Sequence, residues 1–232
     1  MENPWRNIQQ INNEYIAECD VDIMGKIKIL NNKQKDEKKL KLEIIPQPYV
    51  GDPKFAVIYY LLSNPSPLGT ENDYPQKLLF DNLTHKNKDH PFFLLNPKYK
   101  NTKAYDWWNK KLRHIIEDTN LDTISHCFFA IDYMAYFSKK YPYLVDTSNL
   151  PSQAYSCDLI KQAMKEEKII VIARFLKKWN DKLPNLKYYP NTIVLSNPQN
   201  PVISENTAKD LKGIKAYKKI ISKLNSTTFS SS

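Results

Sequence analysis

The chain has 232 residues, which is enough for one large domain with a sizeable hydrophobic core. No stretch of it approaches the ~20 apolar residues that a transmembrane helix needs, and the basic-then-apolar layout of a signal peptide is missing. We therefore expect a cytoplasmic protein with no membrane partner. The formal net charge of +9 favours a polyanionic partner, although lysine-rich chains also carry such charge for solubility alone.

Cysteine and histidine residues give no sign of a disulfide framework or a metal site. Cys19, Cys127 and Cys157 are odd in number and far apart along the chain. The four histidines show none of the spacings that are typical of zinc ligands. The sequence therefore predicts chemistry that needs no metal and no other cofactor.

Residues 1–45 are expected to form an N-terminal extension that packs on the core. A polar, helix-like segment runs from Ile8 to Cys19, and the lysine-rich run from Lys33 to Lys41 predicts a solvated loop. Three prolines between positions 46 and 53 then fix φ and remove backbone donors, which predicts a rigid lead-in to the first core strand. Residues 46–225 would form the α/β domain and residues 226–232 a disordered tail.

Four short apolar runs predict core strands, at residues 55–62, 127–131, 169–173 and 192–195. Their nearly continuous hydrophobicity is typical of strands that are covered on both faces. Apolar residues at helical spacing predict helices between and after them, at residues 103–117, 153–166 and 175–183 and from Glu205, capped by Ser204, to Leu224. This alternation predicts an α/β fold, a three-layer α/β/α sandwich with a four-stranded parallel sheet in the order 2-1-3-4.

Polar residues follow these strands at the edge where open α/β sheets bind their ligands. Asn64-Pro65 comes after the first core strand and Asn197-Pro198 after the last, while Asp132 and Arg174 follow the two strands between them. An Asn-Pro pair also favours an ordinary turn, so either loop alone carries little information. Two such loops at one edge indicate a site.

Both loops resemble the motifs of the uracil-DNA glycosylase superfamily. Asn64-Pro65-Ser66-Pro67-Leu68-Gly69 is similar to the Asn-Pro-Gly loop of some branches, with Ser66 in place of a glycine and Leu68 in place of an aromatic residue. Asn197-Pro198-Gln199-Asn200-Pro201 is similar to the second loop, with Gln199 in place of a serine. The resemblance spans Ile45 to Leu224 and implies a monofunctional DNA glycosylase without a cofactor.

The resemblance also implies a role for each loop residue. Asn64 would position the attacking water through its side-chain carbonyl, and Asn197 would stabilise the leaving base or contact the flipped nucleotide. Ser63 and Ser66 would supply further hydrogen-bond donors. The catalytic pair is therefore Asn64 and Asn197.

The base itself would need an aromatic face and a polar group that reads its edge. Phe92 and Phe93 are candidates for stacking, although both can equally be core residues. Asp132 stands where the family commonly has Asn. An ionised Asp132 only accepts hydrogen bonds, which suits the amino group of cytosine, whereas a protonated one could donate to O4 of uracil if burial raised its pKa. Asp132 can also be a simple helix cap.

Residues around the two loops are candidates for contact with DNA. They are Arg174, Asn200, Lys209 and Lys212 for the phosphates, and Val202 and Ile203 for a wedge in the duplex. The alternatives are a carboxylate partner for Arg174, a solvated face for the lysines and a hydrophobic staple for Val202 and Ile203.

The sequence thus predicts a monomeric DNA glycosylase that removes a pyrimidine, with cytosine or a modified cytosine as the candidate, in repair or in defence against phage with altered DNA. A non-catalytic nucleic-acid-binding domain of the same fold is the main alternative. An enzyme acting on a free nucleotide is a third, against which the lack of a Gly-rich phosphate loop counts.

Overall fold

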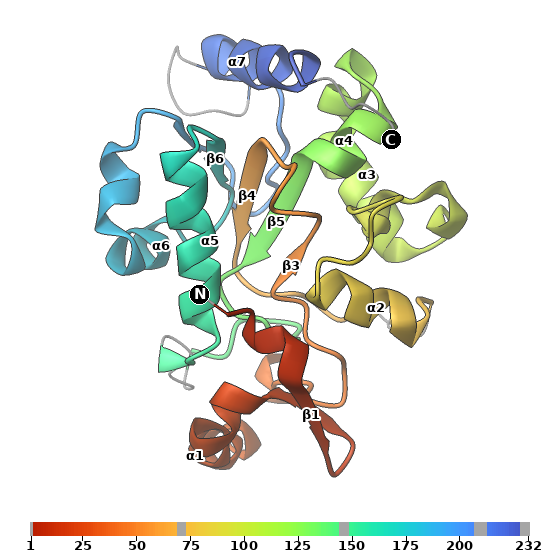
Figure 1. Ribbon diagram of the computed structural model, residues 1–232. Coiled ribbons are helices and arrows are strands. Elements are labelled where there is room, and N and C mark those ends of the chain that lie inside the picture. The colour runs from red at the N-terminus through yellow and green to blue at the C-terminus, as the bar shows by residue number, and fades with distance from the viewer. Residues whose placement is uncertain (1, 69–72, 144–148, 207–212, 228–232) are drawn as a thin grey trace.

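The computed structural model describes residues 2–68, 73–143, 149–206 and 213–227, and its centre is a five-stranded sheet with helices on both faces (Figure 1). The strand order is β3-β5-β4-β6-β7. The strands are β3 (Tyr49–Val50), β4 (Ile58–Leu62), β5 (Phe128–Asp132), β6 (Ile169–Ile172) and β7 (Thr192–Val194). The last four pair in parallel, whereas β3 pairs antiparallel with β5. The α/β class is as predicted.

The sheet differs from the prediction because it is mixed and has one strand more. The extra strand, β3, comes from the proline-rich lead-in. Tyr49 and Val50 follow Pro48 and, unlike proline, each has a backbone N–H group. A proline cannot donate to a ladder, so such a segment can form only a short strand at a sheet edge. The four predicted strands pair in parallel in the relative order 2-1-3-4, but the prediction of a sheet with four strands, all of them parallel, is wrong.

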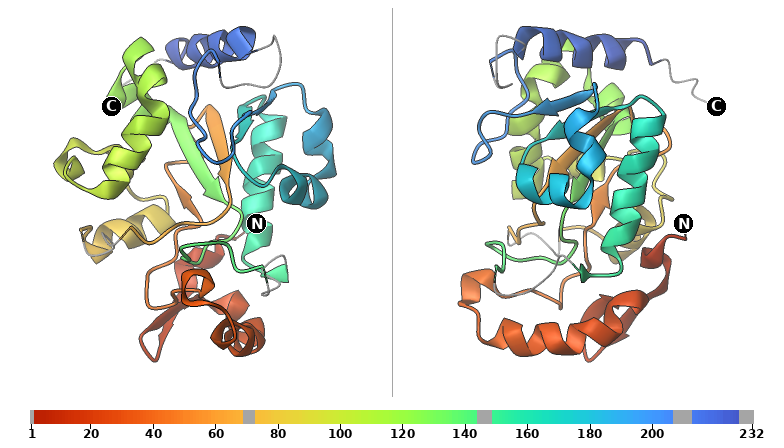
Figure 2. Two further views of the ribbon diagram at one scale, coloured as in Figure 1. Left: turned by 180° about the vertical axis from the view of Figure 1, so that it is seen from behind. Right: turned by 90° about the vertical axis from the view of Figure 1, so that its left-hand side faces the viewer.

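Two layers of helices enclose the sheet (Figures 1 and 2). One face packs against α5 (Gln153–Lys165) and α6 (Leu176–Lys182), and the other against α3 (Lys103–Asp118) and α4 (Leu121–Cys127). Strands β4, β5 and β6 are buried along their whole length, which explains their continuous hydrophobicity. Helices α3, α5 and α6 lie where helices were predicted, whereas α4 and α2 (Gln76–Leu83) were not predicted.

The last helix, α7 (Gly213–Asn225), lies at the end of the sheet where the strands begin (Figures 1 and 2). Lys219 Nζ on α7 donates to Asn191 Oδ1, just before β7. Glu205 and Asn206 lie in a turn, so the predicted helix start at Glu205 is wrong. The Oγ of Ser204 accepts from the N–H of Asn206 at 3.4 Å within that turn.

The N-terminal segment contains a hairpin, β1 (Ile8–Ile11) with β2 (Glu14–Ala17), and then α1 (Val21–Asn32). The helix predicted from Ile8 to Cys19 is wrong because Asn12 and Asn13 both have positive φ, at 51° and 64°. Two such residues form the tight turn that matches the twist of a hairpin. Short 3-10 helices complete the chain: η1 (Pro4–Asn7), η2 (Glu18–Asp20), η3 (Asp36–Lys38), η4 (Phe93–Leu95), η5 (Pro97–Tyr99) and η7 (Pro184–Tyr188).

Residues 2–45 lie beyond the ends of the core strands, opposite α7 (Figures 1 and 2). Buried Asp20 fixes them to the α/β part of the chain: its carboxylate accepts from Tyr136 Oη at 2.8 Å and from Ser152 N and Oγ at 2.9 and 2.6 Å. The extension therefore covers the carboxyl edge of the sheet, which is the edge formed by the C-terminal ends of β4 to β7. No helix in the described part of the chain has the length and apolar character needed to span a bilayer.

Candidate functional site

A cavity of about 270 Å³ opens at the carboxyl edge, beside the ends of β4 and β5. Its volume is close to the roughly 300 Å³ at which ligand pockets of proteins begin, so it suits a ligand with the size of a base or nucleoside. Residues from widely separated parts of the chain contribute to the wall, among them Ile45, Asn64, Phe93, Trp107, Asp132 and Arg174. The site is therefore lined by the N-terminal extension, by the ends of β4 and β5 and by residues of α2 and α3.

Asp132, the last residue of β5, presents a buried carboxyl group to the cavity. Its Oδ1 has no hydrogen-bond partner among the described residues. Burial raises the pKa of Asp132 well above its usual value, and the positive charge of Arg174 opposes this shift without cancelling it. The carboxyl group is consequently neutral at a pH where an exposed Asp is ionised, and it can donate as well as accept.

This protonation state removes the reason for preferring cytosine, which rested on an ionised Asp132. The reading of Asp132 as a helix cap is wrong too, because Tyr133 to Phe137 contain no helix. The backbone N–H of Asp132 instead donates to Pro48 O at 2.9 Å, next to β3. Within the described ranges, no hydrogen bond to Oδ1 accounts for the burial of this side chain.

Asn64 lies in the same cavity wall and is held by one neighbour, Ser138. Asn64 Nδ2 donates to Ser138 O at 2.8 Å, to Ser138 Oγ at 3.1 Å and to Pro65 O at 3.2 Å. Ser138 is fully buried, and its N–H donates back to Pro65 O at 3.1 Å. All three contacts of the amide use Nδ2, so the Oδ1 acceptor is the atom that can meet a ligand or a water.

Both candidate stacking residues are fully buried core residues, but Phe93 lines the cavity and Phe92 does not. Phe93 lines the cavity and meets Tyr74 edge-to-face, with ring centroids 5.3 Å apart. Phe92 is fully buried between Trp108 and Phe128, outside the cavity wall, and is therefore a core residue. The prediction that Phe92 binds the base is not supported.

The candidate serines also differ. Ser66 is exposed and lines the cavity. Ser63 is buried outside the cavity wall, and its carbonyl accepts from the N–H of Met134 at 3.0 Å. Ser63 therefore joins the ends of β4 and β5 and does not face a ligand.

The second loop, residues 197–201, folds back on itself next to the cavity. Asn197 is exposed, and its Oδ1 accepts from the N–H groups of Gln199 and Asn200, both at 3.1 Å. Asn197 is not part of the cavity wall. The structure thus brings Asn64 and Asp132 together at the site, with Phe93, Ser66 and Arg174, but leaves Asn197 on the surface beside it.

Three side chains from the core anchor this second loop. Arg174 Nε donates to Pro198 O at 3.0 Å, Lys111 Nζ donates to Asn200 Oδ1, and Tyr60 Oη donates to Pro201 O at 2.6 Å. Arg174 therefore has no carboxylate partner among the described residues and connects the second loop to the cavity. Asn200 is engaged by Lys111 rather than free to meet DNA.

Among the remaining DNA-contact candidates, Val202 and Ile203 do not line the cavity. Ile203 is buried among the core residues of the α3 face and Val202 is half-buried, so a wedge made of both is wrong for this conformation. Lys209 and Lys212 lie outside the described residues. The described part of α7 lies at the opposite end of the sheet, so its lysines do not face the cavity.

The sequence patterns did not predict that Lys111 lies near the site or that Ile44 to Gln47 form part of the cavity wall. The position of Lys111 on α3 is three residues after Trp108 and four after Trp107, both of which line the cavity. Helical spacing places these three on one face, so Lys111 could have been found once that face was assigned to the site. Nothing in the sequence signals the contact made by residues 44–47.

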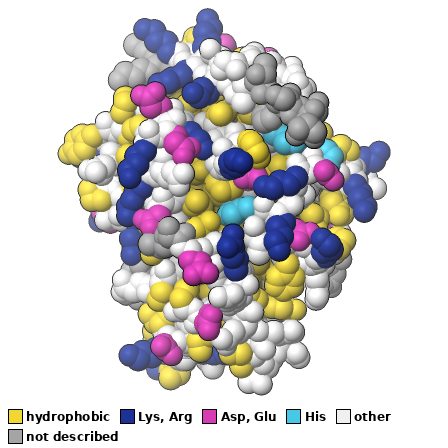
Figure 3. All heavy atoms as spheres, viewed as in Figure 1, with side chains coloured by type: hydrophobic (Ala, Val, Ile, Leu, Met, Phe, Trp, Pro, Cys, Tyr) yellow, Lys and Arg dark blue, Asp and Glu magenta, His cyan; other side chains and the backbone are white. Residues whose placement is uncertain are grey.

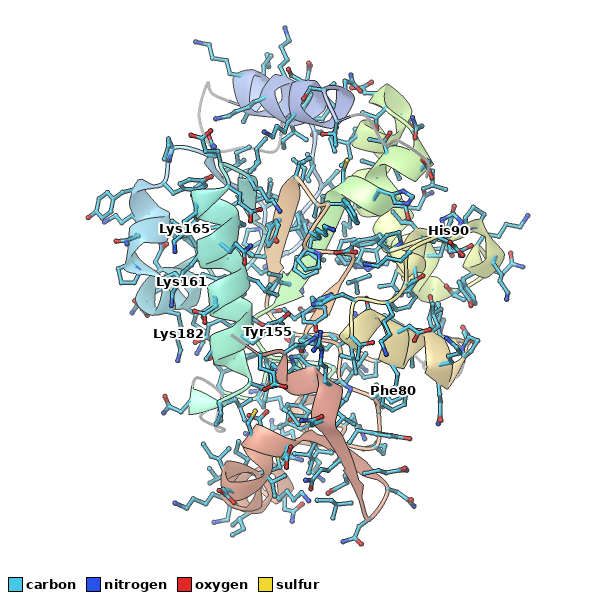
Figure 4. All side chains as sticks on the ribbon, in the orientation of Figure 1. Phe80, His90, Tyr155, Lys161, Lys165 and Lys182 are labelled. Atoms are coloured by element: carbon cyan, nitrogen blue, oxygen red, sulfur yellow. The ribbon has the colours of Figure 1, made fainter. Side chains whose placement is uncertain are left out.

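Basic side chains are spread widely rather than gathered at the cavity. On the face shown in Figure 3, Lys and Arg are scattered with Asp and Glu among them. Figure 4 shows Lys161 and Lys165 of α5 and Lys182 of α6 along one outer side of the molecule. None of the three lines the cavity. The net charge alone therefore does not mark the site.

Within the described ranges, no group of three His, Cys, Asp or Glu residues is arranged to hold a metal ion. Comparison with models of protein families, with curated proteins and with solved structures finds no match. The residues of the cavity are therefore the features that indicate a function.

Proposed function

We propose that the protein is a monofunctional DNA glycosylase that hydrolyses the N-glycosidic bond of a flipped pyrimidine. The observation that carries this proposal is the buried carboxyl group of Asp132, whose Oδ1 has no partner among the described residues, in a base-sized cavity that also holds the amide of Asn64. The partner would be DNA, bound by a monomer. Base release of this kind serves repair or defence against phage with modified DNA.

Recognition of a pyrimidine follows from the protonation state of Asp132. A neutral carboxylic acid has one donor and one acceptor side by side. It can pair with the O4 and N3–H of uracil, or with the N3 and amino group of cytosine. Phe93 would give the base an aromatic face, as flipped bases require. We therefore propose a pyrimidine substrate without a preference set by charge.

The chemistry would depend on placement rather than on a strong base. Loss of the base develops positive charge on the sugar and negative charge on the base. Asn64 Oδ1 would hold the water, because Ser138 fixes the other end of the amide. Arg174 supplies positive charge at the cavity for the departing base.

The direct test is release of a base from DNA. Oligonucleotides that contain uracil, cytosine, thymine or modified cytosines are incubated with the protein and then tested for alkali-labile abasic sites. We expect product with at least one pyrimidine. Asn64→Ala should abolish product with every base and leave DNA binding intact, because it removes the anchor for the water and no phosphate contact.

A non-catalytic nucleic-acid-binding domain is the second candidate, and the position of Asn197 favours it. Its Oδ1 is used within its own loop and its side chain lies outside the cavity, so the leaving base lacks this contact. Tight binding of DNA without product from any base would support this candidate and exclude the glycosylase. Turnover of free nucleosides or nucleotides, with none of DNA, would exclude both.

A further inference from the structure

Lys111 is a buried cation on α3. The residue is 5% exposed, and its Nζ lies 5.3 Å from the centre of the Trp107 ring and donates to Asn200 Oδ1. Among the described residues no carboxylate forms an ion pair with it. An ammonium group has three donors, and Asn200 accepts one of them. Burying a charge with so few hydrogen bonds costs free energy of folding, and binding of an anion would offset that cost.

Arg174 adds a second positive charge next to the first. Its guanidinium donates to Pro198 O at 3.0 Å and to Gln199 O at 3.5 Å, so both cations hold consecutive residues of the second loop. Burial lowers the pKa of Lys111, and the charge of Arg174 lowers it further. The two cations therefore repel each other across a loop that offers them only neutral oxygens.

The surroundings of this pair would accept an anion. Arg174 and Trp107 line the cavity, and Lys111, which does not line it, lies against the Trp107 ring, so the pair lies beside the cavity wall. Asp132 is the one described carboxyl group in the cavity wall, and its raised pKa leaves it uncharged there. A guanidinium and an ammonium together match the oxygens of a phosphate group.

We propose that Lys111 and Arg174 form a binding site for a phosphate group beside the cavity. The phosphate is the one attached to the sugar whose base occupies the cavity, so this assignment rests on the proposed function for the placement of the base. The site needs no bond cleavage, and it is therefore testable apart from catalysis. Lys111 binds the ligand directly and also positions the loop through Asn200.

The first test measures the salt dependence of binding to a labelled single-stranded oligonucleotide with one 2′-fluorinated target nucleotide, which resists cleavage. Lys111→Met keeps the aliphatic stem and removes the charge. A plot of the log association constant against log salt concentration has a negative slope. We expect this variant to make the slope shallower by about 0.7, the value for one phosphate contact on a single strand. Lys110→Met, at the exposed neighbouring lysine, is the matched control and should leave the slope unchanged. An unchanged slope in Lys111→Met, or an equal fall in Lys110→Met, would overturn the proposal.

The second test uses the wild-type protein, so it does not depend on how the variant folds. One phosphate next to the target nucleotide is replaced by an uncharged methylphosphonate. Affinity should fall when the replaced phosphate adjoins the target nucleotide and should stay the same when it lies several nucleotides away. Equal losses at every position would mean diffuse attraction and would refute a defined site.

A third measurement identifies the source of the phosphate. Quenching of tryptophan fluorescence by a free deoxynucleoside monophosphate is compared with quenching by the same nucleoside without phosphate. Tighter binding of the nucleotide supports the site, and binding of the nucleotide in preference to DNA would assign it to a free phosphate monoester. If no base is ever released but the methylphosphonate effect persists, the glycosylase proposal fails while the phosphate site stands.

Discussion

At Asp132, the backbone and the side chain are used for different purposes. The N–H donates to Pro48 O and so helps to close the sheet edge, whereas the carboxyl group enters the cavity with Oδ1 unpartnered. A buried carboxyl group avoids the cost of its charge by keeping its proton. The folded protein therefore binds this proton more tightly than the unfolded chain does.

The tighter proton predicts a pH-dependent difference between the wild type and Asp132→Asn. An unfolded Asp ionises near pH 4, whereas the folded group ionises at a higher pH. Over that interval the folded state holds more protons, so the wild type loses stability as the pH rises, by up to about 1.4 kcal/mol per pH unit. Asn has no proton to lose. In urea unfolding from pH 4.5 to 7.5, the free energy of unfolding of the variant should rise relative to that of the wild type. A difference between the two proteins that does not change with pH would contradict the raised pKa.

Among the secondary-structure elements, β3 is followed by a position where the backbone passes so close to β5 that only glycine fits. Gly51 follows β3 with φ at +111°, and a Cβ there would lie 2.5 Å from Phe128 O. Both the backbone angle and the contact exclude side chains. The glycine thus lets the chain turn away from the edge of the sheet directly beside β5.

Substitution of Gly51 by alanine tests whether this position requires glycine, and the same substitution at Gly25 is the control. Gly51→Ala should destabilise the protein by about 2 kcal/mol or more, because it combines backbone strain with a clash against a carbonyl oxygen. Gly25→Ala, in α1, meets nothing within 4 Å and should stabilise by up to about 1 kcal/mol. Thermal and urea unfolding of both variants measure the difference. A neutral Gly51→Ala would show that β3 can shift without cost.

The elements that the sequence predicts correctly are those with a single strong signal. Strands β4, β5 and β6 are buried on both faces, so each appears as a continuous apolar run. The β1–β2 hairpin was missed because its decisive signal, Asn12-Asn13 in a tight turn, is only two residues long. Edge strand β3 was missed because two residues among prolines form no pattern.

The site could be predicted only as far as strand ends define it. Asn64, Asp132 and Arg174 follow parallel strands, so topology alone brings them to one edge. The wall formed by residues 44–47 and the buried Lys111 depend on packing between distant segments, which local patterns do not encode. The conformation of the second loop, and hence the outward position of Asn197, depends on side-chain bonds to its own backbone.

For the whole molecule, Asp20 is a buried polar link between the N-terminal extension and the α/β part of the chain. It is fully buried, and from the α/β part of the chain it accepts hydrogen bonds from Tyr136 and from two groups of Ser152. The residues that it joins lie more than one hundred positions away in sequence. The link therefore fastens the cover of the cavity to the part that carries Asp132.

Asp20→Ala should loosen the extension. Removing the acceptor leaves buried donors of Tyr136 and Ser152 unsatisfied, which should cost about 3 kcal/mol or more. Urea unfolding measures the loss, and limited proteolysis should detect earlier cleavage within residues 2–45. Asp22→Ala, at an exposed position of α1, is the matched control and should stay within about 0.5 kcal/mol of the wild type. Similar losses for both would contradict the role of Asp20.

The residues of the cavity wall are far apart in sequence, and this affects the order of events in folding. The wall joins Ile45, Asn64, Trp107, Asp132 and Arg174, and the hydrogen bond from Tyr60 to Pro201 spans 141 positions. Contacts between such distant segments form slowly because long loops must close first. We expect the cavity to be completed after the rate-limiting step of folding. In stopped-flow experiments, a nucleotide that fills it should then slow unfolding and leave the rate of refolding unchanged.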